Sequence, residues 1–355
     1  MPTSGSSKWL TDKDRRLSAL PWAAAKISRV LCRRRLIPPG LFCSTLPSMT
    51  SSPAHRTALH PSALPLIGQT PLVHLPTLST DQVAVYGKLE GQNPGGSVKD
   101  RAARAMIEGM LQRGELKDGM RLIEATSGNT GIALAMLARL YGLEIELVMP
   151  ENATAERVQT MRAYGAAVTL TPAAGGMEAA IDHMHAEAAA GRAVMINQFA
   201  NPDNPRAHYE TTGPEIWRDT GGKVTHFVSS MGTTGTIMGV SRYLKEQNEA
   251  VQIIGVQPTE GSNIPGIRRW PAEYLPANYQ PERVDRVLDI SEAESRAMTR
   301  TLAREEAIFA GMSSGGAAAI AARLAQEITA EGGRGLIVSI VCDRGDRYLS
   351  SDLFA

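Results

Sequence analysis

Two stretches of the sequence have the residue types of an anion-binding turn. Each is an apolar run, then a short segment of Gly, Ser and Thr, then an amphipathic run: Leu122–Gly131 before 132–141, and Phe227–Thr236 before 237–246. Glycines let backbone N–H groups converge, hydroxyls add donors, and a helix start carries about half a positive charge. Neither stretch has the Lys of a P-loop or a GxGxxG pattern. One such turn is usually a plain connector, whereas a pair indicates a ligand with two anionic groups.

A third segment supplies an amine. Asn93–Arg101 reads NPGGSVKDR and places Lys99 at the expected start of an amphipathic helix over 99–113. A cation at a helix start opposes the helix dipole, so stability alone favours an acid there. The position of Lys99 therefore indicates a function. The alternative interpretation is an exposed lysine without a function. An amine with two anion-binding turns suits pyridoxal phosphate joined to an amino acid, which has a phosphate, a carboxylate and an imine linkage to Lys.

Composition limits the class of protein and of partner. The 355 residues suffice for about two domains, and 37 Lys and Arg against 36 Asp and Glu exclude the broad positive surface of a nucleic-acid binder. The three cysteines form no CxxC pair and the histidines show no ligand spacing, so no metal is expected. No apolar run of about 18 uncharged residues occurs, so no membrane partner is expected.

The first 60 residues differ from the rest. Residues 1–48 carry a net charge of +7, which leaves −6 for the remainder. An acid-poor segment with Ser, Pro and clustered Arg predicts a disordered or artefactual extension over 1–60, with an organellar targeting signal or a structured arm as alternatives. Without targeting, the expected location is cytoplasmic.

From about Pro61, short apolar runs alternate with amphipathic stretches, which is typical of an α/β fold with a largely parallel sheet covered by helices. A helix over 155–164 is expected to end before Gly165, as helices often do before glycine. The predicted strands are 121–125, 144–149, 167–170, 193–199, 225–229, 252–256 and 336–341.

Taken in order, the motifs resemble those of the fold-type II pyridoxal-phosphate enzymes, and within them the cysteine synthases (O-acetylserine sulfhydrylases). The resemblance covers Leu66 to Phe354, and 258–270 and 342–350 are similar to the B isozyme. The five motifs that carry it are Gly68–Leu72, Asn93–Arg101, Thr126–Gly131, Asn197–Phe199 with its Asn-Pro pairs, and Gly311–Gly315.

The resemblance implies a fold like that of the tryptophan synthase β subunit, with two αβα domains. The larger domain would comprise 61–92 and 204–355 and bind the cofactor phosphate. The smaller, mobile domain would comprise 93–203 and carry Lys99 and the substrate-carboxylate loop.

The resemblance also implies roles for individual residues. Lys99 would link to pyridoxal phosphate and later move the Cα proton of the substrate. The cofactor would be bound by Asn129 at the ring hydroxyl, Ser313 at the ring nitrogen, and Gly232, Thr233, Thr234, Gly235 and Thr236 at the phosphate. The substrate carboxylate would be bound by Thr126, Ser127, Gly128, Thr130 and Gln198.

Three other positions, Arg268, Ser314 and Cys342, leave alternatives open. Arg268 would meet the sulfonate of thiosulfate, and Arg269 is the alternative because adjacent arginines cannot be ranked from sequence. Ser314 could instead be the N-cap of a helix over 317–326. Cys342 is interpreted as a small residue at a strand end rather than as a nucleophile.

The implied reaction is β-replacement of O-acetyl-L-serine by sulfide, or by thiosulfate to give S-sulfocysteine, with loss of acetate through an aminoacrylate. The implied partners are these small molecules and a second copy of the chain. The alternatives are an O-phosphoserine-dependent cysteine synthase, a cystathionine β-synthase, a serine or threonine dehydratase, and a non-catalytic paralogue. The stretches Ile264–Trp270 and Cys342–Ser350 argue against the cystathionine β-synthase and the dehydratase. The intact Lys99 and the two intact anion-binding turns argue against the paralogue.

Overall fold

The computed structural model describes residue 60, residues 62–116 and residues 119–355. The extension predicted over 1–60 therefore lies outside the described residues, except for His60. Within the described ranges, no helix has the length and apolar character needed to cross a membrane.

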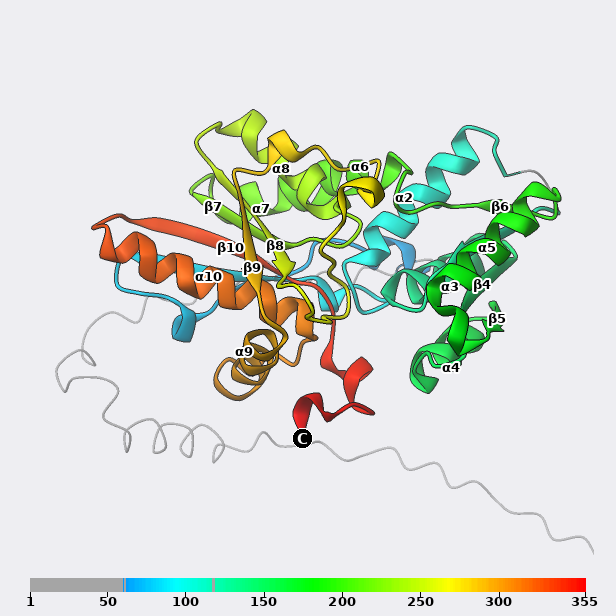
Figure 1. The fold of residues 1–355 in the computed structure, drawn as a ribbon. Helices are drawn as coiled ribbons and strands as arrows, with labels where there is room; N and C mark the ends of the chain where they lie inside the picture. The colour runs from blue at the N-terminus through cyan, green and yellow to red at the C-terminus, as the bar shows by residue number, and fades with distance from the viewer. Residues whose placement is uncertain (1–59, 61, 117–118) are drawn as a thin grey trace, which may run out of the picture. The chain divides into compact units, whose positions relative to one another are not determined.

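A six-stranded sheet has the order β1-β2-β10-β7-β8-β9 and is parallel except for the β1–β2 pair. Helices cover both faces (Figure 1): α9 and α10 share a core with one face, and α7 and α8 share a core with the other. The elements are β1 (Leu72–His74), β2 (Val83–Leu89), α7 (Gly213–Asp219), β7 (His226–Ser230), α8 (Gly235–Gln247), β8 (Gln252–Pro258), β9 (Arg286–Ile290), α9 (Glu292–Glu305), α10 (Met312–Ala330) and β10 (Gly335–Val341).

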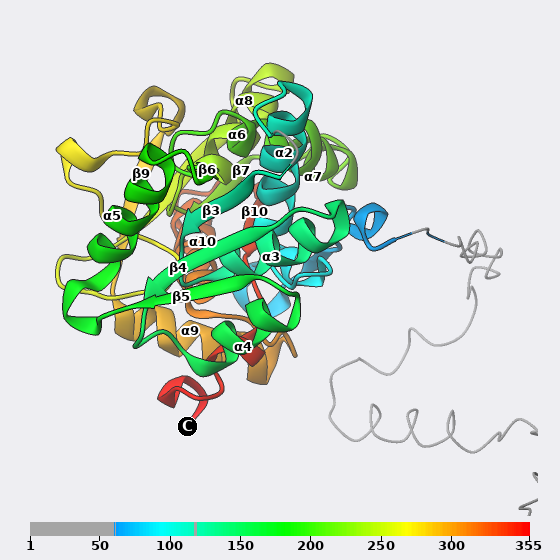
Figure 2. The same ribbon diagram turned by 90° about the vertical axis from the view of Figure 1, so that its right-hand side faces the viewer.

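A second sheet has four parallel strands in the order β5-β4-β3-β6 (Figure 2). One face packs against α2, α3 and α4, and the other packs against α5. The elements are α2 (Lys99–Gln112), β3 (Arg121–Ala125), α3 (Asn129–Tyr141), β4 (Ile145–Pro150), α4 (Ala155–Ala163), β5 (Ala167–Thr171), α5 (Gly176–Ala189) and β6 (Ala193–Met195). The α/β class with largely parallel sheets is confirmed.

Short elements connect the two sheets. The chain passes from β6 through α6 (Asp203–Ala207) and a π-helical turn, His208–Thr212, into α7. The 3₁₀ helices are Leu64–Leu66, Pro76–Leu78, Glu90–Gln92, Ala173–Gly175, Ala272–Tyr274, Pro281–Arg283, Gly345–Tyr348 and Asp352–Phe354.

Two expectations about element ends are wrong. The strand predicted over 193–199 stops at Met195, because Asn197 has a left-handed backbone (φ 55°) that an extended strand cannot contain. Ser314 is not an N-cap: α10 begins at Met312 with Gly311 as its cap, and the Ser314 hydroxyl instead accepts the backbone N–H of Cys342 at 2.9 Å. The predicted end of α4 is correct, since Gly165 follows with φ 92°.

Candidate active site

Lys99 is the first residue of α2, as the sequence predicts. Burial lowers the pKa of its amine, and the nearby Cys342 and Asp343 act in the opposite direction. Among the described residues, no carboxylate oxygen lies within 4 Å of its Nζ. An unpaired amine with a lowered pKa is suited to attack a carbonyl carbon and to exchange protons.

The turn before Lys99 is held by bonds of the Asn93 side chain and by the segment that follows β10. The Asn93 side chain donates to the carbonyl of Glu90 at 2.9 Å and to that of Ser97 at 3.2 Å, and it accepts the backbone N–H of Gly68 at 2.8 Å. The backbone N–H of Val98 donates to the carbonyl of Cys342 at 2.8 Å. The glycine-rich turn that carries Lys99 is therefore fixed in place rather than free.

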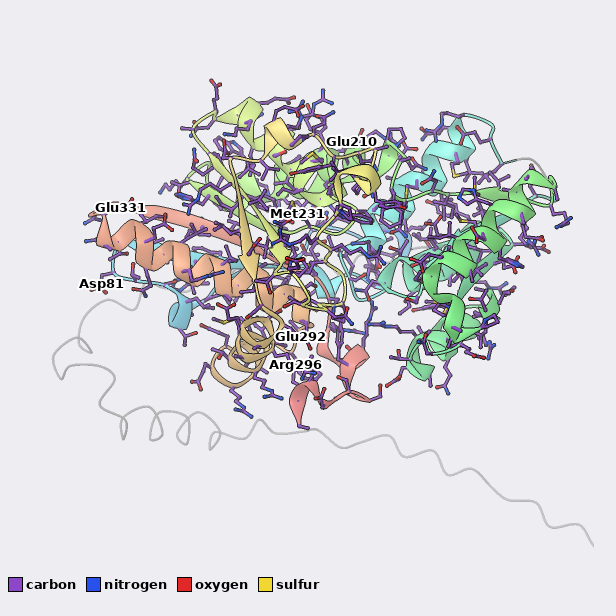
Figure 3. All side chains as sticks on the ribbon, viewed as in Figure 1. Asp81, Glu210, Met231, Glu292, Arg296 and Glu331 are labelled. Atoms are coloured by element: carbon purple, nitrogen blue, oxygen red, sulfur yellow. The ribbon has the colours of Figure 1, made fainter. Side chains whose placement is uncertain are left out.

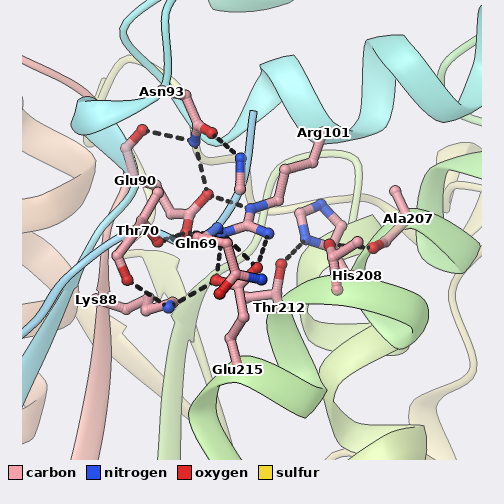
Figure 4. Close-up of polar contacts among 12 residues, drawn as sticks. Gln69, Thr70, Lys88, Glu90, Asn93, Arg101, Ala207, His208, Thr212 and Glu215 are labelled. Atoms are coloured by element: carbon pink, nitrogen blue, oxygen red, sulfur yellow. Dashed lines mark hydrogen bonds and ion pairs between the residues drawn. The ribbon is translucent and has the colours of Figure 1, made fainter. Parts of the chain in front are cut away.

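A buried ion cluster anchors the start of α2 (Figure 4). Arg101 pairs with Glu90 and with Glu215, each at 2.7 Å, and the fully buried Lys88 pairs with Glu215 at 2.7 Å. Burial raises the pKa of Glu215, but the hydrogen bonds and charges of Arg101 and Lys88 outweigh it and lower that pKa to about 2. The sequence does not predict this role for Lys88, Glu90 and Glu215, because a charged residue in a strand or helix gives no sign of a buried partner far along the chain.

The predicted phosphate turn, Gly232–Thr236, runs from just after β7 into the start of α8. Thr234 is the residue before the helix and has a left-handed backbone (φ 65°). A Cβ on Gly232 would lie 2.6 Å from the carbonyl oxygen of Gly266, and a Cβ on Gly235 would collide with the Asn204 side chain. Close neighbours therefore leave no room for a side chain at these two glycines. The turn presents its backbone N–H groups at a helix start.

A buried histidine lies behind this turn. His208 bonds to the Thr236 hydroxyl at 3.2 Å and to the Thr212 hydroxyl at 2.9 Å. Burial lowers the pKa of His208 to about 3, so the imidazole stays neutral at physiological pH. It therefore orients the Thr236 hydroxyl without adding a charge.

The loop after β3 faces the segment that follows β6. The Thr130 hydroxyl donates to the Gln198 side-chain oxygen at 2.7 Å, and both residues are buried. Thr126 is buried, whereas Ser127, Gly128 and Asn129 are half-buried. Two predicted carboxylate-binding residues from separate segments are thus adjacent.

Hydrogen bonds also join this loop to the phosphate turn. The Asn204 amide donates to the carbonyl of Gln198 at 2.8 Å and to the hydroxyl of Thr233 at 3.1 Å. With the bond from Thr130 to Gln198, one continuous chain runs from the first anion-binding turn to the second.

Asn129 has protein partners that the sequence does not predict. Its amide donates to Asp343 at 2.7 Å, and its oxygen accepts from Arg347. The Tyr348 hydroxyl also donates to Asp343, at 2.8 Å. The second N–H of the Asn129 amide is the one available to a ring hydroxyl.

Ser313 is buried in the first turn of α10, and its carbonyl accepts the hydroxyl of Ser230 at 2.7 Å. Burial raises the pKa of the neighbouring Cys342 to about 11, so its sulfur stays a thiol at neutral pH. This agrees with a packing role for Cys342 rather than a nucleophilic one.

The two arginines of the Ile267–Trp270 stretch have different surroundings. Arg269 pairs with Asp289 at 2.5 Å and donates to the carbonyl of Pro258 at 2.9 Å. Arg268 instead lies over the Trp270 ring, 5.2 Å from its centroid, and both line a hollow with Met231 and Thr234. Figure 3 shows Met231 in the interior, away from Asp81 and Glu331 at the opposite end of the large sheet.

Comparison with known proteins identifies the family. Residues 63–343 match the model of the pyridoxal-phosphate dependent enzymes. The chain belongs to this family. Lys99 and both anion-binding turns lie within the matched range.

The relatives of this pyridoxal-phosphate enzyme include several cysteine synthases. Cysteine synthase B of Pseudomonas aeruginosa is 56% identical over 299 residues, which cover 84% of this chain and 99% of that protein. Cysteine synthase B of Escherichia coli is 56% identical over 289 residues, 81% of this chain and 94% of that protein. The structure of cysteine synthase (OASS) from Entamoeba histolytica superimposes with a TM-score of 0.79 at 38% identity and covers 86% of this chain and 93% of that one. The resemblance predicted from the motifs is confirmed, and the chain is an enzyme of the cysteine synthase class.

The residues present fit pyridoxal phosphate. The Gly232–Thr236 turn offers backbone N–H groups and hydroxyls to a phosphate, and Lys99 offers a buried amine to a carbonyl carbon. Ser313 offers a hydroxyl, rather than a carboxylate, to a ring nitrogen. The cofactor of the family and the donor set of this chain agree.

Proposed function

We propose that this enzyme converts O-acetyl-L-serine and sulfide to L-cysteine and acetate. The observation that carries the proposal is a buried amine, Lys99, in the same molecule as two anion-binding turns joined by hydrogen bonds through Gln198 and Asn204. The names of the relatives support the same reaction.

Each group has one task in this proposal. Pyridoxal phosphate, when bound, takes up the negative charge that develops at the substrate Cα. Lys99 holds the cofactor and then removes and returns the Cα proton. The residues Thr126, Ser127, Gly128, Thr130 and Gln198 bind the substrate carboxylate, and Asn129, Ser313 and Gly232–Thr236 hold the ring and the phosphate.

The segment 93–203 is proposed to act as the smaller, mobile domain. It contains the four-stranded sheet and the carboxylate loop, whereas 61–92 and 204–355 contain the six-stranded sheet and the phosphate turn. Substrate carboxylate bound at Thr126–Thr130 would draw this part onto the rest and exclude water from the reacting atoms.

Thiosulfate is proposed as a second sulfur donor, giving S-sulfocysteine. The support is the pairing of Arg269 with Asp289, which leaves Arg268 as the arginine facing the hollow beside Met231 and Thr234. A homodimer and a cytoplasmic location complete the proposal; both are drawn from the family resemblance.

Steady-state kinetics of the purified holoenzyme test the reaction. O-acetylserine and O-phosphoserine are each offered with sulfide and with thiosulfate, and the amino-acid product is identified. Cysteine from O-acetylserine and sulfide supports the proposal. Homocysteine as the acceptor and L-serine alone are offered in separate assays. Faster turnover of O-phosphoserine, cystathionine from homocysteine, or pyruvate from serine would each assign a different reaction to the same site.

A further inference from the structure

A buried carboxylate lies directly behind the proposed carboxylate loop. Glu124 is on β3, two residues before Thr126, and its side chain is 2% exposed. One of its oxygens accepts the backbone N–H of Asn197 at 2.9 Å, and the other accepts the backbone N–H of Gln198 at 3.4 Å. Glu124 thus bridges two consecutive N–H groups of the segment that follows β6.

These two N–H groups belong to a turn with an unusual backbone. Asn197 has φ 55°, a conformation that side-chain-bearing residues adopt at a cost of about 1 kcal/mol or more. Its carbonyl accepts the N–H groups of Ala200 at 3.1 Å and Asn201 at 2.9 Å, which closes the turn on the other side. Such a backbone persists only where its surroundings hold it, and Glu124 is the side chain that holds its N–H side.

The turn determines where the Gln198 side chain points. Its backbone N–H is held by Glu124, its carbonyl by Asn204, and its side-chain oxygen by Thr130. The oxygen of the Gln198 amide is occupied by Thr130, and the NH₂ group of the same amide interacts with Glu124 and lowers the pKa of that carboxyl. Because an amide NH₂ has two N–H donors, one of them is left for a ligand.

Stability alone does not account for Glu124. Burial raises its pKa to about 7, the bonds from Asn197 and Gln198 act in the opposite direction, and no cation contributes to that pKa. On the next strand, the buried Glu146 has a cation, Arg121, at 3.0 Å. A buried acid without a cation costs stability, so an uncharged residue would serve a purely structural purpose better.

We propose that Glu124 is a positioning residue for the substrate carboxylate. By holding the backbone N–H groups of Asn197 and Gln198, it directs the Gln198 amide towards the Thr126–Thr130 loop. This rests on the proposed function, in which Gln198 and that loop bind the substrate carboxylate. Glu124 itself touches neither substrate nor cofactor.

The test uses a pair of ligands that differ only at the carboxylate. The affinities of the Glu124→Gln holoenzyme for L-serine and for L-serinamide are measured from the change in cofactor absorption. One N–H of the turn loses its acceptor in this variant, so binding of L-serine should weaken about tenfold, while binding of L-serinamide changes less than about twofold. With O-acetylserine, KM should rise about tenfold, and kcat and the KM for sulfide should stay within about twofold.

Two further variants make the result decisive. Glu146→Gln, the matched removal of a buried carboxylate on β4, should leave the ratio of the two affinities unchanged. Glu124→Asp keeps the charge with a shorter side chain, so it should weaken binding of L-serine less than Glu124→Gln does and again leave L-serinamide unchanged. That difference between the two ligands is the readout if Glu124→Gln does not fold.

Equal weakening for L-serine and L-serinamide would show that Glu124 only supports the fold, and unchanged affinities would show that it does not position Gln198. These outcomes are separate from the proposed function. A wild-type enzyme that binds L-serine but does not convert O-acetylserine would reject that function, while the comparison of the two ligands would still decide the role of Glu124.

Discussion

The indole N–H of Trp270 donates to the backbone carbonyl of Gly232 at 2.8 Å. The backbone N–H of Arg268 donates to the carbonyl of Met231 at 3.0 Å, so Gly232, the first residue of the proposed phosphate turn, and the residue before it are both bonded to the Arg268–Trp270 segment. A shift in the backbone of either segment is therefore expected to displace the other, whereas a change confined to the Arg268 side chain leaves these bonds in place.

The Arg268→Ala variant should distinguish the two sulfur donors. Thiosulfate is a dianion that needs a cation near the reacting carbon, whereas sulfide is small and needs none. Arg268 is exposed, which reduces the strength of a charge-assisted bond, so kcat/KM for thiosulfate should fall roughly tenfold and that for sulfide less than about threefold. Steady-state kinetics with each donor measure this.

Arg269→Ala is the matched control for that prediction. Its guanidinium is engaged by Asp289 and Pro258, so its loss should affect both donors alike. A thiosulfate-specific loss in Arg269→Ala, with none in Arg268→Ala, would exchange the two roles.

The Gly232→Ala variant should bind the cofactor more weakly. The added Cβ would lie 2.6 Å from the Gly266 carbonyl oxygen, and because that atom is backbone, either the turn or the backbone at Gly266 must move. We expect the affinity for pyridoxal phosphate, titrated into the apoenzyme, to fall at least about tenfold. An unchanged affinity for pyridoxal phosphate in Gly232→Ala would contradict the explanation.

The Glu215→Gln variant should remove a pH-dependent part of the stability. The pKa of Glu215 is about 2 in the folded protein against an ordinary value of 4.5. Its ionised form therefore stabilises the fold above pH 4.5, and this contribution is lost as the pH falls towards 2. Urea denaturation should show a loss of about 3 kcal/mol at pH 7 that shrinks as the pH falls below 4.5.

The exposed pair Arg242 and Glu246 provides the comparison for Glu215. Glu246→Gln should lower the free energy of unfolding by less than about 1 kcal/mol, both at pH 7 and below pH 4.5, because solvent screens an exposed ion pair. Similar losses in the two variants would mean that the buried cluster of Lys88, Arg101 and Glu215 does not act as an anchor.

The Lys99→Ala variant should lose turnover but still bind the cofactor. The covalent link and the phosphate turn are separate sources of affinity, so pyridoxal phosphate should remain bound, although dialysis should remove it more readily. Turnover should fall by roughly 10²–10⁴-fold or more, because no other amine replaces the proton-transferring group. Borohydride should fix the cofactor covalently to the wild type only; wild-type turnover in the variant would reject the role of Lys99.

The sequence predicts best the parts whose signal is local. The strand 121–125, the start of α2 at Lys99 and the end of α4 agree with the structure, because apolar periodicity and a following glycine lie within a few residues. The early start of α10 was missed, since Met312-Ser-Ser-Gly-Gly gives no apolar repeat although all five residues are buried there.

Residues that act through distant partners escaped prediction. Lys88 reads as a polar position of β2, yet it is fully buried because Glu215 from α7 neutralises it. Asp343 and Arg347 bond to Asn129 only because the fold brings the segment after β10 against α3. The motifs themselves can be read in the sequence, but the contacts among them depend on how the chain folds.

The bond from Val98 to Cys342, with the bridge between Ser97 and Asp343, has a consequence for biosynthesis of the enzyme. The lysine turn emerges early from the ribosome, but its partner segment follows β10, a central strand of the large sheet that is made last among the strands. Pairing segments so distant along the chain is slow. In a nascent chain Lys99 is therefore an ordinary solvated lysine, and its amine acquires its lowered pKa only after residue 343 has been translated and the turn is buried.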